Sequence, residues 1–210
     1  MAEKNTTPDA MMHLEQIKRA RVAVRIVGLT PLIVHRFDEK AKKQMLDAQV
    51  KTSVKAKRAP QDPEAEFEAS RYRLDDGRDG LPAVAFKSAL IGAARLFDGV
   101  TMTQLKSVVH VAGEGSQQLV AIDGEPRMRE DVVRVGMGTA NLRYRAEYWP
   151  WAAWLIVSHV PTLISADSVL SLVNAAGMGG VGEWRPSAPK SLTGSYGTFE
   201  VEVGDEGILL

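Results

Sequence analysis

The part of the sequence best suited to contact an anion is a glycine-rich run, Gly177-Met-Gly-Gly-Val-Gly182-Glu-Trp-Arg185. Glycine has no Cβ, so the main-chain N–H groups around Gly179, Gly180 and Gly182 can approach a phosphate closely, as in anion-binding nests. Trp184 beside Arg185 adds a ring for stacking next to a cation. Glycines are also typical of helix C-termini, and Trp184 would then only fill a gap. The residues alone leave both interpretations open.

A second candidate anion site is the basic stretch over residues 51–60. It contains no acidic residue, and its cations are Lys51, Lys55, Lys57 and Arg58. Its local field is therefore positive, although a solvated surface loop explains the same composition. Lys87 stands near the start of a predicted helix. There it would either meet a phosphate or lie along the surface on its aliphatic stem.

Other residue types give weaker signals. Glu130 and Asp131 interrupt the arginines of 127–145, which fits outward positions on strands; these arginines are Arg127, Arg129, Arg134, Arg143 and Arg145. Trp154 lies in an apolar run and is predicted to be in the core, whereas Trp149 and Trp151 flank a proline and favour a protein contact. The four histidines lack the close helical spacing of metal ligands, so we predict neither a metal nor a cofactor.

The composition fits one folded domain. The chain has 210 residues, of which 45% are hydrophobic, and this is enough for a substantial core. It contains no apolar run long enough to cross a bilayer and no secretory pattern at its start, so we expect a cytoplasmic protein without a membrane partner. The absence of cysteine excludes disulfides and thiolate chemistry. The formal net charge is zero, so any site for a polyanion must be local.

Hydrophobic periodicity then predicts the elements that position these residues. A half-buried strand begins at Arg21, with Val22, Val24 and Ile26 on one side, and a short extended segment follows over 32–34. Helices are predicted over 38–50, from 62, over 86–97 and from 165. Further strands are predicted over 108–111, 119–122, 127–135, 142–148, 152–160 and 195–203, the first two pairing across a glycine turn.

The last third of the chain reads strand, helix, glycine loop, strand, which is the second half of a ferredoxin-like repeat. The strand from Arg21 and the helix from Phe86 supply the first half. We therefore predict an α+β, modified ferredoxin-like (RRM-like) fold with an inserted lobe at about 38–80 and a C-terminal glycine-rich loop. The domain spans 21–203, preceded by an arm over 1–20 and followed by a tail over 204–210.

Three marks in the sequence resemble the RAMP superfamily of CRISPR-associated RNA-binding proteins. They are Leu29-Thr-Pro-Leu-Ile-Val34, Leu81-Pro-Ala-Val-Ala-Phe-Lys87, and the glycine run followed by Gly194-Ser-Tyr-Gly197. The resemblance spans most of 21–203, but Ala83-Val-Ala85 stands where the backbone subunits usually have Gly-Ser-Ser. The chain is also similar to proteins of phages and prophages. It thus resembles a stand-alone, phage-encoded relative of these subunits.

The resemblance implies a sequence-tolerant protein that binds single-stranded RNA or DNA and assembles side by side into an oligomer or filament. The site would include Lys51, Lys55, Lys57, Arg58, Lys87, Gly179, Gly180, Gly182, Trp184 and Arg185. One alternative is a protein-interaction module that mimics a subunit of a host CRISPR complex. Another is a metal-independent endoribonuclease in which His35, near Arg36 and Asp38, is the general base and Arg36 stabilises the developing charge. We expect binding rather than catalysis.

Overall fold

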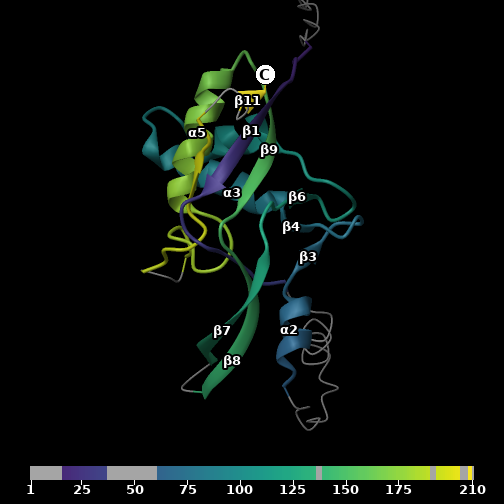
Figure 1. Ribbon diagram of the computed structural model, residues 1–210. Coiled ribbons are helices and arrows are strands. Elements are labelled where there is room, and N and C mark those ends of the chain that lie inside the picture. The colour runs from purple at the N-terminus through teal and green to yellow at the C-terminus, as the bar shows by residue number, and fades with distance from the viewer. Residues whose placement is uncertain (1–15, 37–60, 136–138, 190–192, 204–207, 210) are drawn as a thin grey trace, which may run out of the picture.

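The structure is a computed structural model of the 210-residue chain, in which residues 16–36, 61–135, 139–189, 193–203 and 208–209 are described. These residues include three β-sheets, the helices α2 to α5 and the glycine-rich loop (Figure 1). The predicted helix over 38–50 and the cations Lys51, Lys55, Lys57 and Arg58 lie outside the described residues.

The central sheet has the ferredoxin-like strand order. Its strands are β1 (Ala20–Gly28), β5 (His110–Val111), β9 (Ala152–His159) and β10 (Phe199–Val201), in the spatial order β10-β1-β9-β5. All neighbours are antiparallel. Helix α3 (Ala83–Ala93) lies between β1 and β5 in the chain, and α5 (Ala166–Gly179) lies between β9 and β10. The chain therefore confirms the predicted fold class, α+β with a modified ferredoxin-like arrangement.

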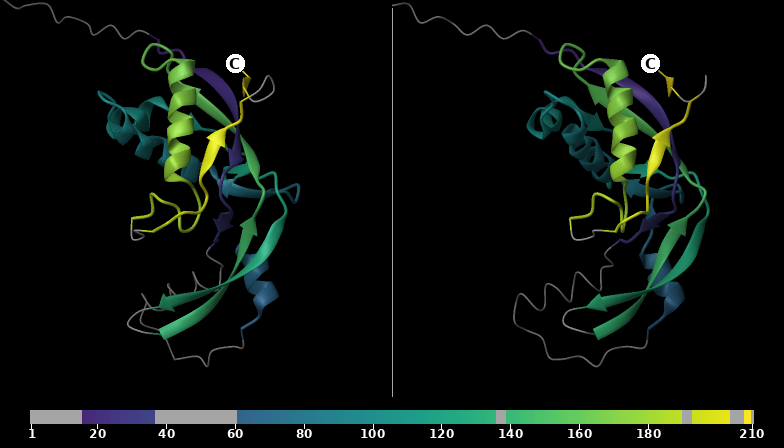
Figure 2. Two further views of the ribbon diagram at one scale, coloured as in Figure 1. Left: turned by 60° about the vertical axis from the view of Figure 1, so that its left-hand side comes forward. Right: turned by 90° about the vertical axis from the view of Figure 1, so that its left-hand side faces the viewer.

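The core forms between one face of this sheet and the two long helices. Val22, Val24 and Ile26 of β1 are buried in a single cluster with Phe86 of α3 and Val169 of α5. Ser165 caps α5 by accepting a hydrogen bond from the Ser168 amide, as the sequence predicts. Figure 2 shows α3 and α5 on the same side of the strands. The other face carries the alternate residues of β1 and β9.

A long hairpin extends away from the central sheet (Figure 1). It consists of β7 (Pro126–Val135) and β8 (Thr139–Tyr148), as the sequence predicts, and β8 also pairs with the short strand β2 (Leu32–Val34). Helix α2 (Pro63–Ala69), which Asp62 caps, packs beside β8. The Ser70 hydroxyl accepts a hydrogen bond of 2.9 Å from the Ala146 amide of β8. This lobe therefore includes residues from both 61–70 and 126–148.

A third, smaller sheet connects the hairpin lobe to α3. It consists of β3 (Tyr72–Arg73), β4 (Asp79–Pro82) and β6 (Leu119–Ala121), in the order β3-β4-β6. After α3 the chain continues through the 3-10 turn η1 (Ala94–Leu96) and α4 (Met102–Val108). The predicted pairing of 108–111 with 119–122 is wrong, because β5 pairs with β9 and β6 with β4. Only an isolated bridge from Glu114 to Leu119 closes the predicted turn.

The tryptophans and Phe97 correct three further predictions. Trp154 is 41% exposed, because β9 has helices on one face only and alternate residues point away from them. Trp151, predicted to lie at a protein contact, is buried and its indole donates a hydrogen bond to the Thr30 carbonyl at 2.9 Å. Phe97, the last residue of the helix predicted over 86–97, lies outside any helix, because it follows η1 in an extended conformation, and it is partly exposed.

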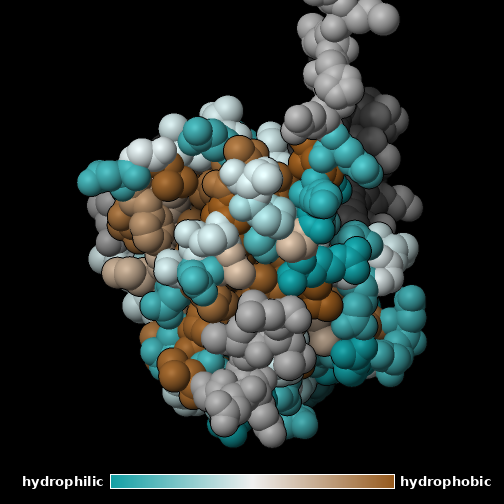
Figure 3. Space-filling model, turned by 90° about the horizontal axis from the view of Figure 1, so that it is seen from above, coloured by the Kyte–Doolittle hydropathy of each residue, from teal (hydrophilic) through white to brown (hydrophobic). Residues whose placement is uncertain are grey.

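Segments near both ends of the described chain add strands to the central sheet. Strand β1 begins at Ala20, and two residues of the predicted tail form β11 (Ile208–Leu209), which pairs with β1 beyond β10. The view from above shows hydrophobic residues interspersed with hydrophilic ones on that end of the molecule (Figure 3). No helix among the described residues is both long enough and apolar enough to span a membrane.

One glycine of α5 allows a close contact in the core and gives a test of the fold. A Cβ on Gly177 would overlap the Phe199 carbonyl oxygen of β10, whereas a Cβ on Gly92 of α3 meets nothing within 4 Å. We expect Gly177→Ala to lower the free energy of unfolding by about 3 kcal/mol because helix and strand must separate. Gly92→Ala should raise it by about 0.5–1 kcal/mol. Urea unfolding of both variants measures the difference, and equal effects would contradict the packing.

Candidate functional site

The glycine-rich loop after α5 is attached to the first half of the chain by main-chain hydrogen bonds. The Glu183 amide donates to the Ile33 carbonyl of β2 at 2.9 Å. The Val181 amide donates to the Gly197 carbonyl at 2.9 Å, and the Gly197 amide donates to the Pro31 carbonyl at 2.8 Å. The loop therefore closes over the end of β2 and holds the segment that leads into β10.

Two of its glycines are required by this close approach. Gly182 has φ +78°, and a Cβ there would lie 2.5 Å from the Ile33 carbonyl oxygen. Gly180 has φ +67°, and its amide donates to the Ala176 carbonyl at the end of α5. The Ser187 amide likewise donates to the Gly179 carbonyl. Packing and helix termination thus account for these glycines, while their contact with a polyanion stays a prediction.

The same loop forms one wall of a groove of about 840 Å³ whose other wall is α3 and η1. Four residues that the sequence singles out line this groove: His35, Gly179, Gly182 and Arg185. Apolar side chains of α3, η1 and α5 form much of the remaining surface, among them Val84, Leu96 and Met178, which are more than half exposed. The fold therefore brings together residues that are 150 positions apart (35 to 185) in the sequence.

Two arginines that line the groove have no carboxylate partner among the described residues. Among the charged side chains that line it, Arg95 and Arg185 are cationic and Glu183 is acidic. Neither arginine forms an ion pair with a residue that the structure describes, and Arg185 donates to the Gly182 carbonyl at 2.8 Å. The Arg36 guanidinium lies 6.0 Å from the ring centre of Tyr72, another residue of the groove wall. Lys87 is half-buried on α3, outside the groove lining.

His35 lies at the end of β2, where burial lowers the pKa of its imidazole below the ordinary value of 6.5. The carboxylate of Glu183 opposes this shift, and the guanidinium of Arg145 adds to it. The ring is therefore neutral at pH 7, the form that a general base requires. Arg36 follows in the chain and Asp38 lies outside the described residues, so the predicted catalytic set cannot be completed from the described part of the chain.

A buried ion-pair cluster supports the groove from the hairpin side. Arg145 of β8 is 4% exposed and donates to Asp131 of β7 at 2.8 Å. Arg129 donates to the same carboxylate at 2.8 Å and to Glu147 at 2.5 Å. Because Asp131 is itself buried, its charge is stable there only while both arginines face it. The sequence predicts outward positions for these arginines, and this prediction is wrong for Arg145, which is buried.

Trp184 connects this cluster to the glycine-rich loop. Its ring centre lies 4.4 Å from the Arg145 guanidinium and 5.5 Å from that of Arg129. Tyr196 packs against it with ring centres 6.0 Å apart. Trp184 is half-buried, and its cationic neighbours in the structure are Arg145 and Arg129. Through its contacts with Arg145 and Arg129, the Trp184 ring holds the loop against the hairpin.

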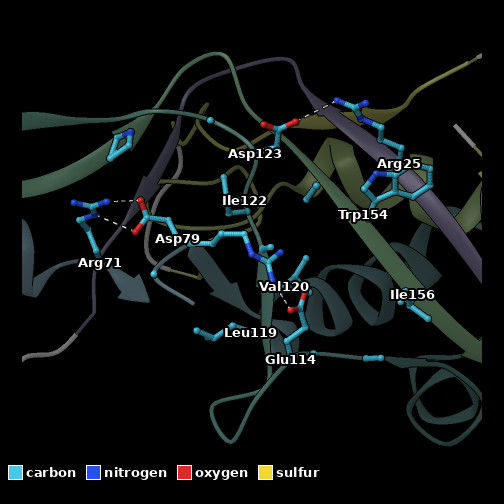
Figure 4. A pocket seen from close by; sticks show the side chains of 18 of the residues that line it. Arg25, Arg71, Asp79, Glu114, Leu119, Val120, Ile122, Asp123, Trp154 and Ile156 are labelled. Atoms are coloured by element: carbon cyan, nitrogen blue, oxygen red, sulfur yellow. Dashed lines mark hydrogen bonds and ion pairs between the residues drawn. The ribbon is translucent and has the colours of Figure 1, made fainter. Parts of the chain in front are cut away.

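A second concave surface lies on the face of the sheet that the helices leave open (Figure 4). It measures about 900 Å³, and its lining includes Trp154 and Ile156 of β9. Its arginines are all paired: Arg25 with Asp123, Arg71 with Asp79 at 2.6 Å, and Arg78 with Glu114 at 2.7 Å. With the carboxylate of Glu125 added, four acidic side chains face three arginines. This hollow therefore offers a polyanion no unpaired cation.

The site residues divide into three groups. His35, Gly179, Gly182 and Arg185 share the groove, Gly180 and Trp184 hold its wall, and Lys87 stands apart on α3. Arg95 and Tyr72 belong to the groove but are missed by the sequence analysis, because neither stands in a motif. No three metal-ligating side chains come together anywhere in the described ranges.

Comparisons with known proteins give a distant likeness to solved structures. No family model matches the chain, and no curated protein matches it either. Among solved structures, it is similar to the crystal structure of Cmr6 from Pyrococcus furiosus, with a TM-score of 0.39 and 10% sequence identity, over 89% of this chain and 100% of that one. The fold assignment above rests on the strand order of this chain. Membership of the RAMP superfamily stays a prediction.

The cluster around Asp131 predicts an unequal response to the loss of two arginines. Arg145→Met leaves a buried carboxylate with half of its cationic partners, so we expect the free energy of unfolding to fall by about 3 kcal/mol. Arg78→Met removes a solvent-exposed ion pair on the other concave surface and should leave the free energy of unfolding almost unchanged. Urea denaturation of both variants checks this difference. A loss for Arg145→Met as small as that for Arg78→Met would show that the cluster does not hold the hairpin.

The environment of His35 predicts a pH dependence with a definite sign. In the unfolded chain the imidazole has its ordinary pKa, so between the lowered folded value and 6.5 the unfolded state binds more protons. The contribution of His35 to stability should therefore be fully present above pH 6.5, fall as the pH falls through that window, and stay constant below the folded-state pKa. NMR titration of the His35 ring, assigned with His35→Gln, should give a pKa below 6.5 in the wild type and a still lower one in Glu183→Gln. A pKa at or above 6.5 would contradict the buried position.

Proposed function

We propose that this protein binds single-stranded nucleic acid, RNA or DNA, in the groove between α3 and the glycine-rich loop, with little dependence on base sequence. The observation that carries the proposal is the contrast in charge pairing between the two concave surfaces. Arg95 and Arg185 lack ion-pair partners among the described residues, whereas Arg25, Arg71 and Arg78 of the hollow are each neutralised. A guanidinium binds a phosphate more tightly when no ion pair with a carboxylate has to be broken first.

The charge of the whole chain agrees with a local site. The formal net charge is zero, so no long-range positive field attracts a polyanion to the molecule as a whole. Affinity would then come from a few phosphate contacts and from stacking or apolar contact with bases. Such binding weakens as salt rises, because each phosphate contact releases condensed counterions.

The apolar part of the groove favours single strands over duplexes. Val84, Leu96 and Met178 present aliphatic or thioether surface along the groove, and Tyr72 adds a ring. Bases in a duplex are stacked on one another, whereas unpaired bases can lie against such side chains. Apolar contact with a base face discriminates poorly among the four bases, which supports the proposed tolerance of sequence.

Self-association is the second part of the proposal, and the open sheet face supports it. Trp154 and Ile156 are 41% and 43% exposed there and are surrounded by paired charges. An exposed tryptophan within a polar rim is typical of protein contacts rather than of phosphate contacts. We propose that a second copy of the chain covers this face, so that copies lie side by side and their grooves form one longer path. A phage origin and a host CRISPR complex as partner stay predictions from the sequence.

Cleavage is not part of the proposed function. His35 lines the groove with a neutral ring, and Asp38 of the predicted catalytic set lies outside the described residues. RNA cleavage with His35 as general base stays a prediction from the sequence.

Removal of the unpaired arginines provides the test. We expect Arg95→Ala/Arg185→Ala to weaken binding of fluorescent U20 RNA and dT20 DNA by about tenfold for each arginine at low salt. The slope of log affinity against log salt should decrease in magnitude by about 1.4, since each phosphate contact of a single strand contributes about 0.7. Fluorescence anisotropy over a sodium chloride series measures both quantities.

The matched control for this test is Arg25→Ala/Arg78→Ala, which removes two paired arginines from the hollow. It should leave affinity and slope almost unchanged. If the control weakens binding as much as the groove variant, the site is misplaced. If the wild-type protein binds neither oligonucleotide, the proposed function is wrong.

A further inference from the structure

The groove contains one acidic side chain, and its position is fixed by the fold. Among the described residues that line the groove, Glu183 is the only carboxylate. Its amide is bound to the Ile33 carbonyl at 2.9 Å, and Gly182 before it can adopt its conformation only because it lacks a Cβ. The backbone of Glu183 therefore cannot retreat from the groove when a ligand enters.

The carboxylate of Glu183 keeps an open side. Its Oε2 atom lies 3.7 Å from Arg145 Nη1, a long ion pair, and the side chain is 42% exposed. The Arg145 guanidinium is held away from Glu183 by its hydrogen bond to Asp131, at 2.8 Å, and by its contact with the Trp184 ring. The Glu183 carboxylate also acts on the neutral ring of His35. Glu183 is thus a hydrogen-bond acceptor with the Arg145 guanidinium behind it and the groove in front.

A phosphate next to this carboxylate would be repelled, so a bound strand must turn some other group toward it. Arg95 and Arg185 attract the phosphates, and the bases are then the part of the strand that faces Glu183. An ionised carboxylate only accepts hydrogen bonds. Among the base edges, guanine offers two adjacent donors, N1–H and N2–H, which match the two oxygens of one carboxylate. Adenine, cytosine and uracil each place an acceptor beside their donor.

Resting on the proposed function, we propose that Glu183 reads the Watson–Crick edge of one unpaired guanine in an otherwise sequence-tolerant strand. Both oxygens of its carboxylate accept from the guanine, while Arg145 behind it stabilises the negative charge. The residue determines specificity at one position of the groove. Sugar type plays no part in this contact, so the preference holds for both RNA and DNA.

Repeating oligonucleotides test the preference without knowledge of the binding register. We expect the wild-type protein to bind (UG)6 about tenfold more tightly than (UA)6, (UC)6 or U12, as measured by fluorescence anisotropy, with the DNA counterparts ranked in the same order. Glu183→Gln replaces one acceptor by a donor, so the side chain can no longer accept from N1–H and N2–H of guanine together. Its amide matches the donor and neighbouring acceptor that every base presents, so the variant should lose the preference for (UG)6.

The control is Glu200→Gln on β10, an exposed carboxylate outside the groove, which should keep the wild-type order of affinities. Unchanged urea midpoints for both variants establish that they are folded. If the wild type binds all four repeats equally, or if Glu183→Gln keeps the guanine preference, the proposal for Glu183 is overturned while strand binding itself stands. Absence of binding to every repeat overturns the proposed function instead.

Discussion

The close approach of the glycine-rich loop to the end of β2 is the constraint on which the rest of the structure depends. A hydrogen bond from the Glu183 amide to the Ile33 carbonyl joins the two halves of the chain, and Gly182 permits it by lacking a Cβ. This contact forms one wall of the groove and places Trp184 against Arg145 of the long hairpin. The ferredoxin-like core, the hairpin and the groove thereby become one connected unit, although they come from distant parts of the sequence.

The two concave surfaces of the molecule differ in whether their arginines are paired with carboxylates. In the hollow on the open sheet face, each arginine has a carboxylate partner, so a phosphate would have to compete for a cation that is already neutralised. In the groove, Arg95 and Arg185 have no such partner among the described residues. A chain with zero net charge can therefore offer a polyanion one favourable surface, and the exposed Trp154 on the other surface suits a contact between proteins.

Local patterns in the sequence predict much of the fold but little of the pairing. The alternation in β1 and the cap at Ser165 each identify an element from adjacent residues, and both are confirmed. The turn at Gly113 to Gly115 shows only that the chain reverses, and the partners of β5 and β6 are strands distant in sequence. The glycine-rich loop is recognisable from its composition, but its contact with Ile33 is not, since no local signal in the sequence indicates what a glycine packs against. Arg95 belongs to no motif and becomes visible only when α3 and the loop face one another.

Direct mapping of the contacts tests the central claim that the groove, and not the open sheet face, holds the strand. The measurement is ultraviolet crosslinking of the protein to single-stranded RNA that contains 4-thiouridine, followed by mass spectrometry of the crosslinked peptides. Crosslinks should fall on Tyr72, on the residues of α3 and η1, and on the loop over 178–189. Crosslinks concentrated on Trp154 and Ile156, with none in the groove, would contradict the account.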